Sequence, residues 1–96
     1  MARIQEDLRR ARAAERVLLE QVHYLDGLAD DAETRRLTAE TPLADRDWRD
    51  ARTDLVRHTA SLEDARRRVA DLLAEQDDLL ERLFELETAT GRRDHP

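Results

Sequence analysis

Three histidines and a single serine are the candidates for a zinc site or a nucleophilic site in this chain of 96 residues. His58 precedes Ser61 by three positions in a continuous helical pattern, which supplies neither the strained turn nor the oxyanion donors that a nucleophilic serine needs. His23 has Gly27 four residues later, where a helical zinc pair needs a second histidine, and His95 lies near the C-terminus. We therefore expect no enzyme activity, no metal and no cofactor.

The composition is typical of long helices rather than of a compact globular domain. Charged residues make up 42% of the chain and aromatic residues 3%, whereas a compact domain of this size needs a thicker apolar core. Cysteine is absent, so the chain has neither disulfides nor thiolate metal ligands. All 17 basic residues are arginine, which we interpret as the codon bias of a GC-rich, actinobacterial genome.

The net charge of −6 narrows the range of partners. Such a chain has no general attraction for nucleic acid or for anionic lipid. No run approaches the roughly 18 apolar residues of a membrane-spanning helix, and no apolar signal-peptide core follows the N-terminus. We expect a cytoplasmic protein whose partner is another protein or a second copy of itself, with no direct nucleic-acid or membrane partner.

The strongest pattern is a heptad stripe in the second half of the chain. Alternating steps of three and four residues reach Trp48, Ala51, Leu55, His58, Leu62, Ala65, Val69, Leu72, Gln76, Leu79, Leu83 and Leu86. A weaker stripe in the first half runs through Ile4, Leu8, Ala11, Glu15, Leu18, Val22, Leu25, Ala29 and Ala32. A period of about 3.5 residues keeps one seam of a helix turned toward a partner helix.

Thr41 and Pro42, with Trp48 just beyond them, mark a turn between the two stripes. Threonine is a good N-cap and proline is favoured at the first helical position. We predict helices over about residues 3–39 and 42–90, a turn at about 39–42, a stop at Gly91, and a disordered tail over 92–96. A short connection forces two long helices to run antiparallel, so residues 1–91 should form an all-α, antiparallel two-helix coiled-coil hairpin.

The charges favour one register of the hairpin, in which the numbers of facing residues sum to about 84. This register brings Arg9, Arg10 and Arg12 opposite Asp71, Glu75, Asp77 and Asp78, Arg66 to Arg68 near Glu15 and Glu20, and Asp26, Asp30, Asp31 and Glu33 near Arg49, Arg52 and Arg57. Opposite charges therefore support the antiparallel pairing.

Three polar residues, Glu15, His58 and Gln76, interrupt the two seams. Buried polar groups in coiled coils commonly set the register and the oligomeric state, and this is the role we expect. The alternative is a ligand-binding or proton-sensing role, because the carboxylate of Asp26 faces His58 in the favoured register and could raise its pKa.

The second helix is longer than the first, so its last turns should lack a facing helix within the chain. We expect the partner-binding residues there: Leu73, Leu80, Leu83, Phe84 and Leu86, with the acidic Asp77, Asp78 and Glu81 beside them. A partner or a second copy should complete the hairpin, since such apolar surface is rarely left exposed to water. The alternative is a monomeric hairpin with a frayed end.

The segments Glu15–Asp30 and Asp54–His58, with the arginines Arg66 to Arg68, resemble the RsiG family of actinobacterial anti-sigma factors. The resemblance implies a helical hairpin that binds a flagellar-type sigma factor of the WhiG class. The family binds cyclic di-GMP through a Glu, Ser, Arg, Gln, Asp signature on each helix. The corresponding positions here are Glu15, Leu19, Val22, Asp26 and Asp30, then Thr59, Glu63, Arg66, Ala70 and Ala74. Three of these positions fit, so the resemblance implies that cyclic di-GMP binding is lost or altered.

Two other functional classes fit the same pattern. A structural coiled coil could self-associate into a four-helix bundle. The secreted WXG100 proteins are also two-helix hairpins with Trp at the turn, but here Asp50 stands where their motif has Gly. We predict a transcriptional regulator of anti-sigma type and keep these two as alternatives.

Overall fold

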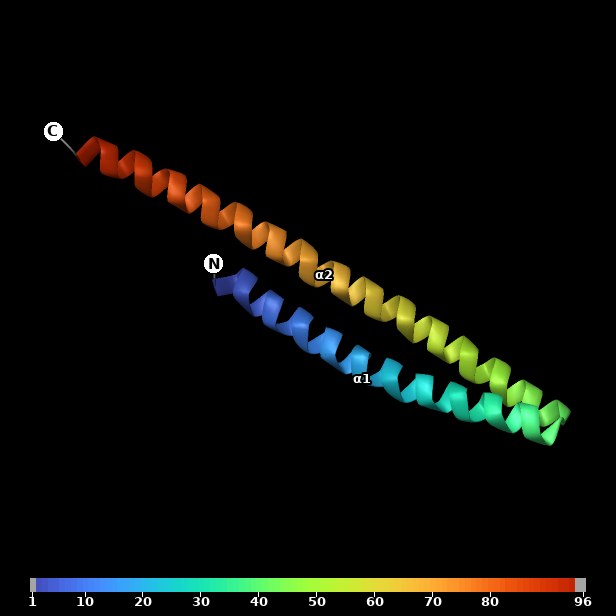
Figure 1. Ribbon diagram of the computed structural model, residues 1–96. Coiled ribbons are helices and arrows are strands. Elements are labelled where there is room, and N and C mark those ends of the chain that lie inside the picture. The colour runs from blue at the N-terminus through green and yellow to red at the C-terminus, as the bar shows by residue number, and fades with distance from the viewer. Residues whose placement is uncertain (1, 95–96) are drawn as a thin grey trace.

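The computed structural model describes residues 2–94, and the side chains of residues 2–90. Within this range the chain forms two helices, α1 (Ala2–Ala39) and α2 (Pro42–Asp94). They run antiparallel as a slender hairpin, and α2 extends well beyond the start of α1 (Figure 1). The prediction of an all-α helical hairpin is confirmed.

The turn consists of Glu40 and Thr41, between the two helices. Glu40 adopts a left-handed conformation with φ 49°, and its N–H donates to the carbonyl oxygen of Arg36 at 3.2 Å. This geometry closes α1, as a residue in the left-handed region commonly does after the last helical turn. The Thr41 hydroxyl accepts a hydrogen bond from the Ala44 N–H at 3.2 Å, and Pro42 is the first residue of α2. Threonine therefore caps α2, and the missing proline N–H costs that helix nothing.

The two seams face each other along the whole of α1. The buried apolar side chains of the described residues are Ile4, Leu8, Ala29, Ala32, Ala44, Leu62 and Leu72. The other seam side chains up to Leu79 are half-buried, whereas Leu83 and Leu86 are exposed. Three of the buried residues, Ala29, Ala32 and Ala44, lie near the turn, and side chains of this size let two helices pack closely.

An aromatic and charged cluster holds the helices together beside the turn. The Arg36 guanidinium lies 4.1 Å from the centroid of the Trp48 ring, and that of Arg52 lies 5.6 Å away. Arg36 also forms an ion pair with Asp45 at 3.2 Å. Because Arg36 is on α1 and the other three residues are on α2, the contacts at Arg36 tie the last turn of α1 to the first turns of α2.

The structure corrects the predicted end of the second helix. α2 continues through Gly91 to Asp94 instead of stopping near Thr90. Glycine weakens a helix by about 1 kcal/mol relative to alanine, which is not enough to end it without a left-handed cap or a following proline. Residues 92–94 of the predicted tail are therefore helical, and residues 95–96 lie outside the described range.

The charge pairing is also sparser than the favoured register suggests. Between the helices, the ion pairs of the described residues are Glu15–Arg66 and Arg36–Asp45, whose numbers both sum to 81. Arg9 and Arg10 instead bind Glu6 on their own helix, at 2.6 and 3.1 Å. Exposed side chains three or four positions apart on one helix reach each other more readily than side chains on the facing helix.

Candidate partner-binding surface

The end of α2 projects beyond the start of α1 as an apolar surface. Leu79 is the last seam residue that packs against the core cluster around Ile4. Beyond it, the exposed fractions rise to 48% at Leu80, 45% at Leu83 and 69% at Phe84. Leu86 is similarly exposed, at 64%. We call Leu80, Leu83, Phe84 and Leu86 the α2 overhang.

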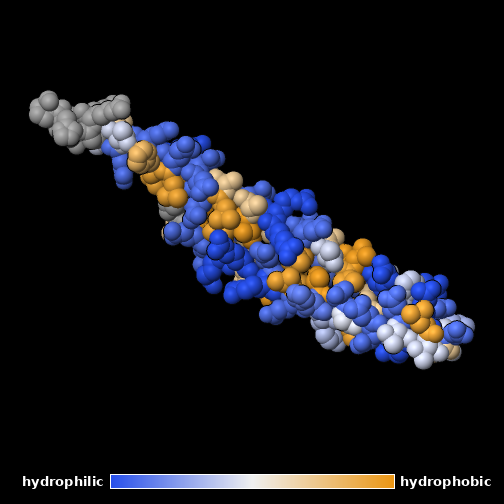
Figure 2. Space-filling model, in the orientation of Figure 1, coloured by the Kyte–Doolittle hydropathy of each residue, from blue (hydrophilic) through white to orange (hydrophobic). Residues whose placement is uncertain are grey.

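The overhang continues the pattern that packs the hairpin. Leu83 and Leu86 keep the heptad phase of the seam, and Leu80 and Phe84 widen it on one side. Figure 2 shows an apolar patch next to the grey C-terminal residues, bordered by hydrophilic surface. A helix that packed against the overhang would therefore contact a continuation of the same apolar stripe that α1 contacts nearer the turn.

The acidic residues expected at this surface, Asp77, Asp78 and Glu81, are all exposed. Leu73 differs from the other predicted partner-binding residues because its side chain packs against the cluster of Ile4, Leu8 and Leu72. It is half-buried, so only part of it remains available to a partner. Leu73 thus lies at the border between the hairpin core and the overhang.

The three polar seam residues are all half-buried. The carboxylate of Glu15 lies 3.6 Å from Nε of Arg66 on α2. The His58 Nδ1–H donates to the carbonyl oxygen of Asp54, one turn earlier on α2, at 2.9 Å. Among the described residues, no carboxylate forms an ion pair with His58, so the contact with Asp26 on which the proton-sensing alternative depends is not observed.

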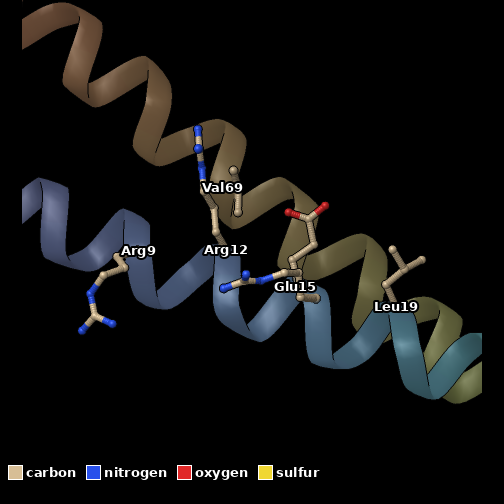
Figure 3. Close-up of a pocket in the computed structure, with 6 residues that line it drawn as sticks. Arg9, Arg12, Glu15, Leu19 and Val69 are labelled. Carbon is tan, nitrogen blue, oxygen red and sulfur yellow. The ribbon is translucent and has the colours of Figure 1, made fainter.

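An open groove of about 560 Å³, which the sequence interpretation missed, runs along one side of the hairpin. Its lining residues are Arg9, Arg12, Glu15, Arg16, Leu19 and Val69. In Figure 3 the Arg12 and Glu15 side chains extend toward α2, whereas Arg9 points away from it. The signal was present in the sequence, because the three arginines and Leu19 recur in steps of three and four, one position after the seam. We call this the arginine groove.

A second group of exposed apolar side chains lies on α1. Val17, Tyr24 and Leu28 are 53%, 68% and 38% exposed. They recur at spacings of seven and four residues, so they share one face of the helix. Each of them directly precedes a seam residue, and the described α2 residues that directly precede its seam are polar. This face is the main alternative to the overhang as a contact surface.

Comparisons with known proteins supply no relative: no family model matches the chain, and neither curated proteins nor solved structures give a significant match. Among the described residues, no three His, Cys, Asp or Glu side chains are grouped so as to hold a metal ion. Neither helix contains an apolar segment long enough to cross a membrane over the residues described.

Proposed function

We propose that the chain is a non-enzymatic protein-interaction hairpin whose α2 overhang binds a helix of another protein. The observation that carries this proposal is the exposure of Leu80, Leu83, Phe84 and Leu86 beyond the end of α1, in phase with the seam. Removing this surface from water stabilises a complex by about 25 cal/mol per Å² of apolar area. A helix with its own apolar stripe is the partner element that matches such a surface.

The charges around the overhang define the partner further. Asp77, Asp78 and Glu81 precede or lie within it, and Arg82 is the one basic residue between Asp71 and Glu87. A partner helix flanked by arginine or lysine would gain favourable electrostatic interactions and a faster association rate. A protein surface that binds DNA phosphates in another complex is rich in arginine and lysine, and it would suit the acidic residues beside the overhang.

A sigma factor is the partner we propose, and the chain is then a cytoplasmic transcriptional regulator of anti-sigma type. The support is the resemblance of Glu15–Asp30 and Asp54–His58 to the RsiG hairpins, together with the acidic overhang. Cyclic di-GMP is not part of this proposal, because most signature positions carry other residues, such as Leu19 and Val22 on α1. Self-association is the second candidate, and the arginine groove is the observation that favours it.

The test is a binding titration between the purified chain and a purified flagellar-type sigma factor. The parent should bind, and the double variant Leu83→Asp, Phe84→Asp should lose at least about tenfold in affinity, because two charges would enter an apolar interface. Both residues are exposed, so the helicity measured by circular dichroism should stay unchanged.

The matched control is Leu37→Asp with Leu43→Asp, at the opposite end of the hairpin. These leucines are 68% and 67% exposed, so the control has the same charge change in a setting at least as exposed as that of Leu83. It should bind like the parent. Equal binding by all three chains would show that the overhang is not the contact surface, and no binding by the parent would remove the sigma factor from the proposal.

A further inference from the structure

We propose that a second copy of the chain docks antiparallel on the first, so that the α2 overhang of each copy lies along the arginine groove of the other. The overhang and the groove lie on the same side of the hairpin. Leu73 and Leu80 each directly follow a seam residue of α2. Arg9, Arg12, Arg16 and Leu19 each directly follow a seam residue of α1.

Equivalent flanks of the two helices lie on the same side of an antiparallel pair. A hollow on the other side of this hairpin shows the same relationship. Its lining includes Asp7 of α1 and Arg68 and Glu75 of α2, and each of these residues directly precedes a seam residue. The residues that follow the seam therefore share the opposite side. Leu73, Leu80 and the arginine groove thus form one continuous lateral face.

The apolar residues of this face are self-complementary under a two-fold axis. When Phe84 of one copy is placed at the height of Val69 of the other, its Leu80 falls beside the second copy's Leu73. The two-fold axis then generates the same two contacts with the roles of the copies exchanged, as in an isologous interface. Each copy contributes Phe84, which is 69% exposed in the single hairpin.

The same alignment brings opposite charges together. The Glu15–Arg66 ion pair places Arg9 at the height of Leu72 and Arg16 at the height of Ala65. Glu87 directly follows the seam residue Leu86, and the incoming α2 then brings it between Arg12 and Arg16. Within the described residues Arg12 and Arg16 form no ion pair of their own, so the docked glutamate supplies their partner.

The two-fold axis passes beside Asp77, whose carboxylates from the two copies then repel each other. The self-complex is for this reason weak and reversible rather than permanent. It covers Leu80 and Phe84, which the proposed partner also needs. Self-association and partner binding therefore exclude each other, a consequence that rests on the proposed function, whereas the dimer itself does not.

The experiment is sedimentation velocity of the purified chain over a wide range of concentrations, without any partner. The parent should form a concentration-dependent dimer. The variant Arg12→Glu, Arg16→Glu should raise the dissociation constant by about tenfold or more, because attraction at both grooves becomes repulsion. Adding Glu87→Arg to that variant should restore much of the dimer, because the charges of both partners are then exchanged. The control Arg46→Glu, Arg57→Glu has the same change in net charge away from the face and should dimerise like the parent.

Cross-linking gives a second readout, since the chain contains no cysteine of its own. Asp77→Cys should oxidise to a disulfide-linked dimer, because the two copies meet at this position. The control is Asp78→Cys, one residue further on and about 100° around the helix, and it should stay monomeric under the same oxidation.

A parent that remains monomeric at every concentration would overturn the proposal. A dimer that Arg12→Glu, Arg16→Glu and the control Arg46→Glu, Arg57→Glu weaken equally would also overturn it. Equal cross-linking through Asp77→Cys and Asp78→Cys would do the same. These outcomes concern the chain alone, so they leave the sigma-factor titration as a separate test of the proposed function.

Discussion

Nε of Arg66 on α2 lies 3.6 Å from Oε1 of Glu15 on α1, joining the two helices by an ion pair at the edge of the seam. The Glu15 side chain is 30% exposed and that of Arg66 is 55% exposed, so water screens the interaction. Its main effect is to select one alignment of the helices rather than to stabilise them. It does so together with the Arg36–Asp45 pair at the turn, which has the same register.

Replacing Glu15 by leucine should therefore increase the stability of the hairpin. Apolar contact with Val69 and Leu19, which line the same groove, should outweigh the lost exposed ion pair, with a gain of about 1 kcal/mol in the free energy of unfolding. Urea denaturation followed by circular dichroism measures this, with Glu20→Leu as the exposed control. A lower midpoint for Glu15→Leu than for the parent would mean that the ion pair does stabilise the fold.

Leu72→Ala should be the most damaging truncation in the hairpin. Leu72 is 2% exposed and belongs to the cluster with Ile4 and Leu8, so its loss leaves a cavity and should cost about 2–4 kcal/mol. Leu83→Ala is the matched control because it removes the same atoms from the overhang, and its effect should be within about 0.5 kcal/mol. Equal losses in thermal denaturation would contradict the assignment of the core.

Gly27→Ala should stabilise α1. A Cβ at this position meets nothing within 4 Å, so alanine fits without strain. Alanine is favoured over glycine within a helix by about 1 kcal/mol, partly through the entropy of the unfolded chain. The melting temperature of the purified variant at low concentration should rise. A fall would contradict the finding that the hairpin leaves room for a side chain at Gly27.

The first turns of α1 should weaken in acid. Hydrogen bonds from Arg9, at 2.6 and 3.0 Å, hold the pKa of Glu6 below its ordinary value, with a smaller contribution from Arg10. Because the folded-state pKa is the lower one, this stabilisation is present above the ordinary glutamate pKa and is lost as the pH falls through the folded-state value. NMR titration should report a higher Glu6 pKa in Arg9→Gln, whereas Arg12→Gln should leave it unchanged.

The hairpin could be predicted from the sequence because two independent signals agree. Heptad spacing defines both seams, and the threonine–proline pair defines the turn. The end of α2 could not be predicted in the same way, since Gly91 is a helix stop only when a left-handed cap forms there. The partners of Arg9 and Arg10 were also missed, because exposed charges choose among neighbours that differ by tenths of a kcal/mol.

The candidate surface was only partly predictable. The overhang follows from the unequal lengths of the helices, since Leu83 and Leu86 have no facing residue on α1. The arginine groove also has a signal, the recurrence of Arg9, Arg12 and Arg16 beside the seam, but it emerges only once both helices are placed side by side. The identity of the partner does not follow from heptads, because all coiled-coil hairpins share them.

Hydrogen–deuterium exchange of the chain, with and without the purified sigma factor, tests the central claim most directly. In the free chain at low concentration, the amides of residues 80–90 should exchange faster than those of residues 55–72, which face α1. In the complex, residues 80–90 should become protected. Unchanged exchange over residues 80–90, with protection instead along the α1 face of Val17, Tyr24 and Leu28, would contradict the assignment of the α2 overhang as the binding surface.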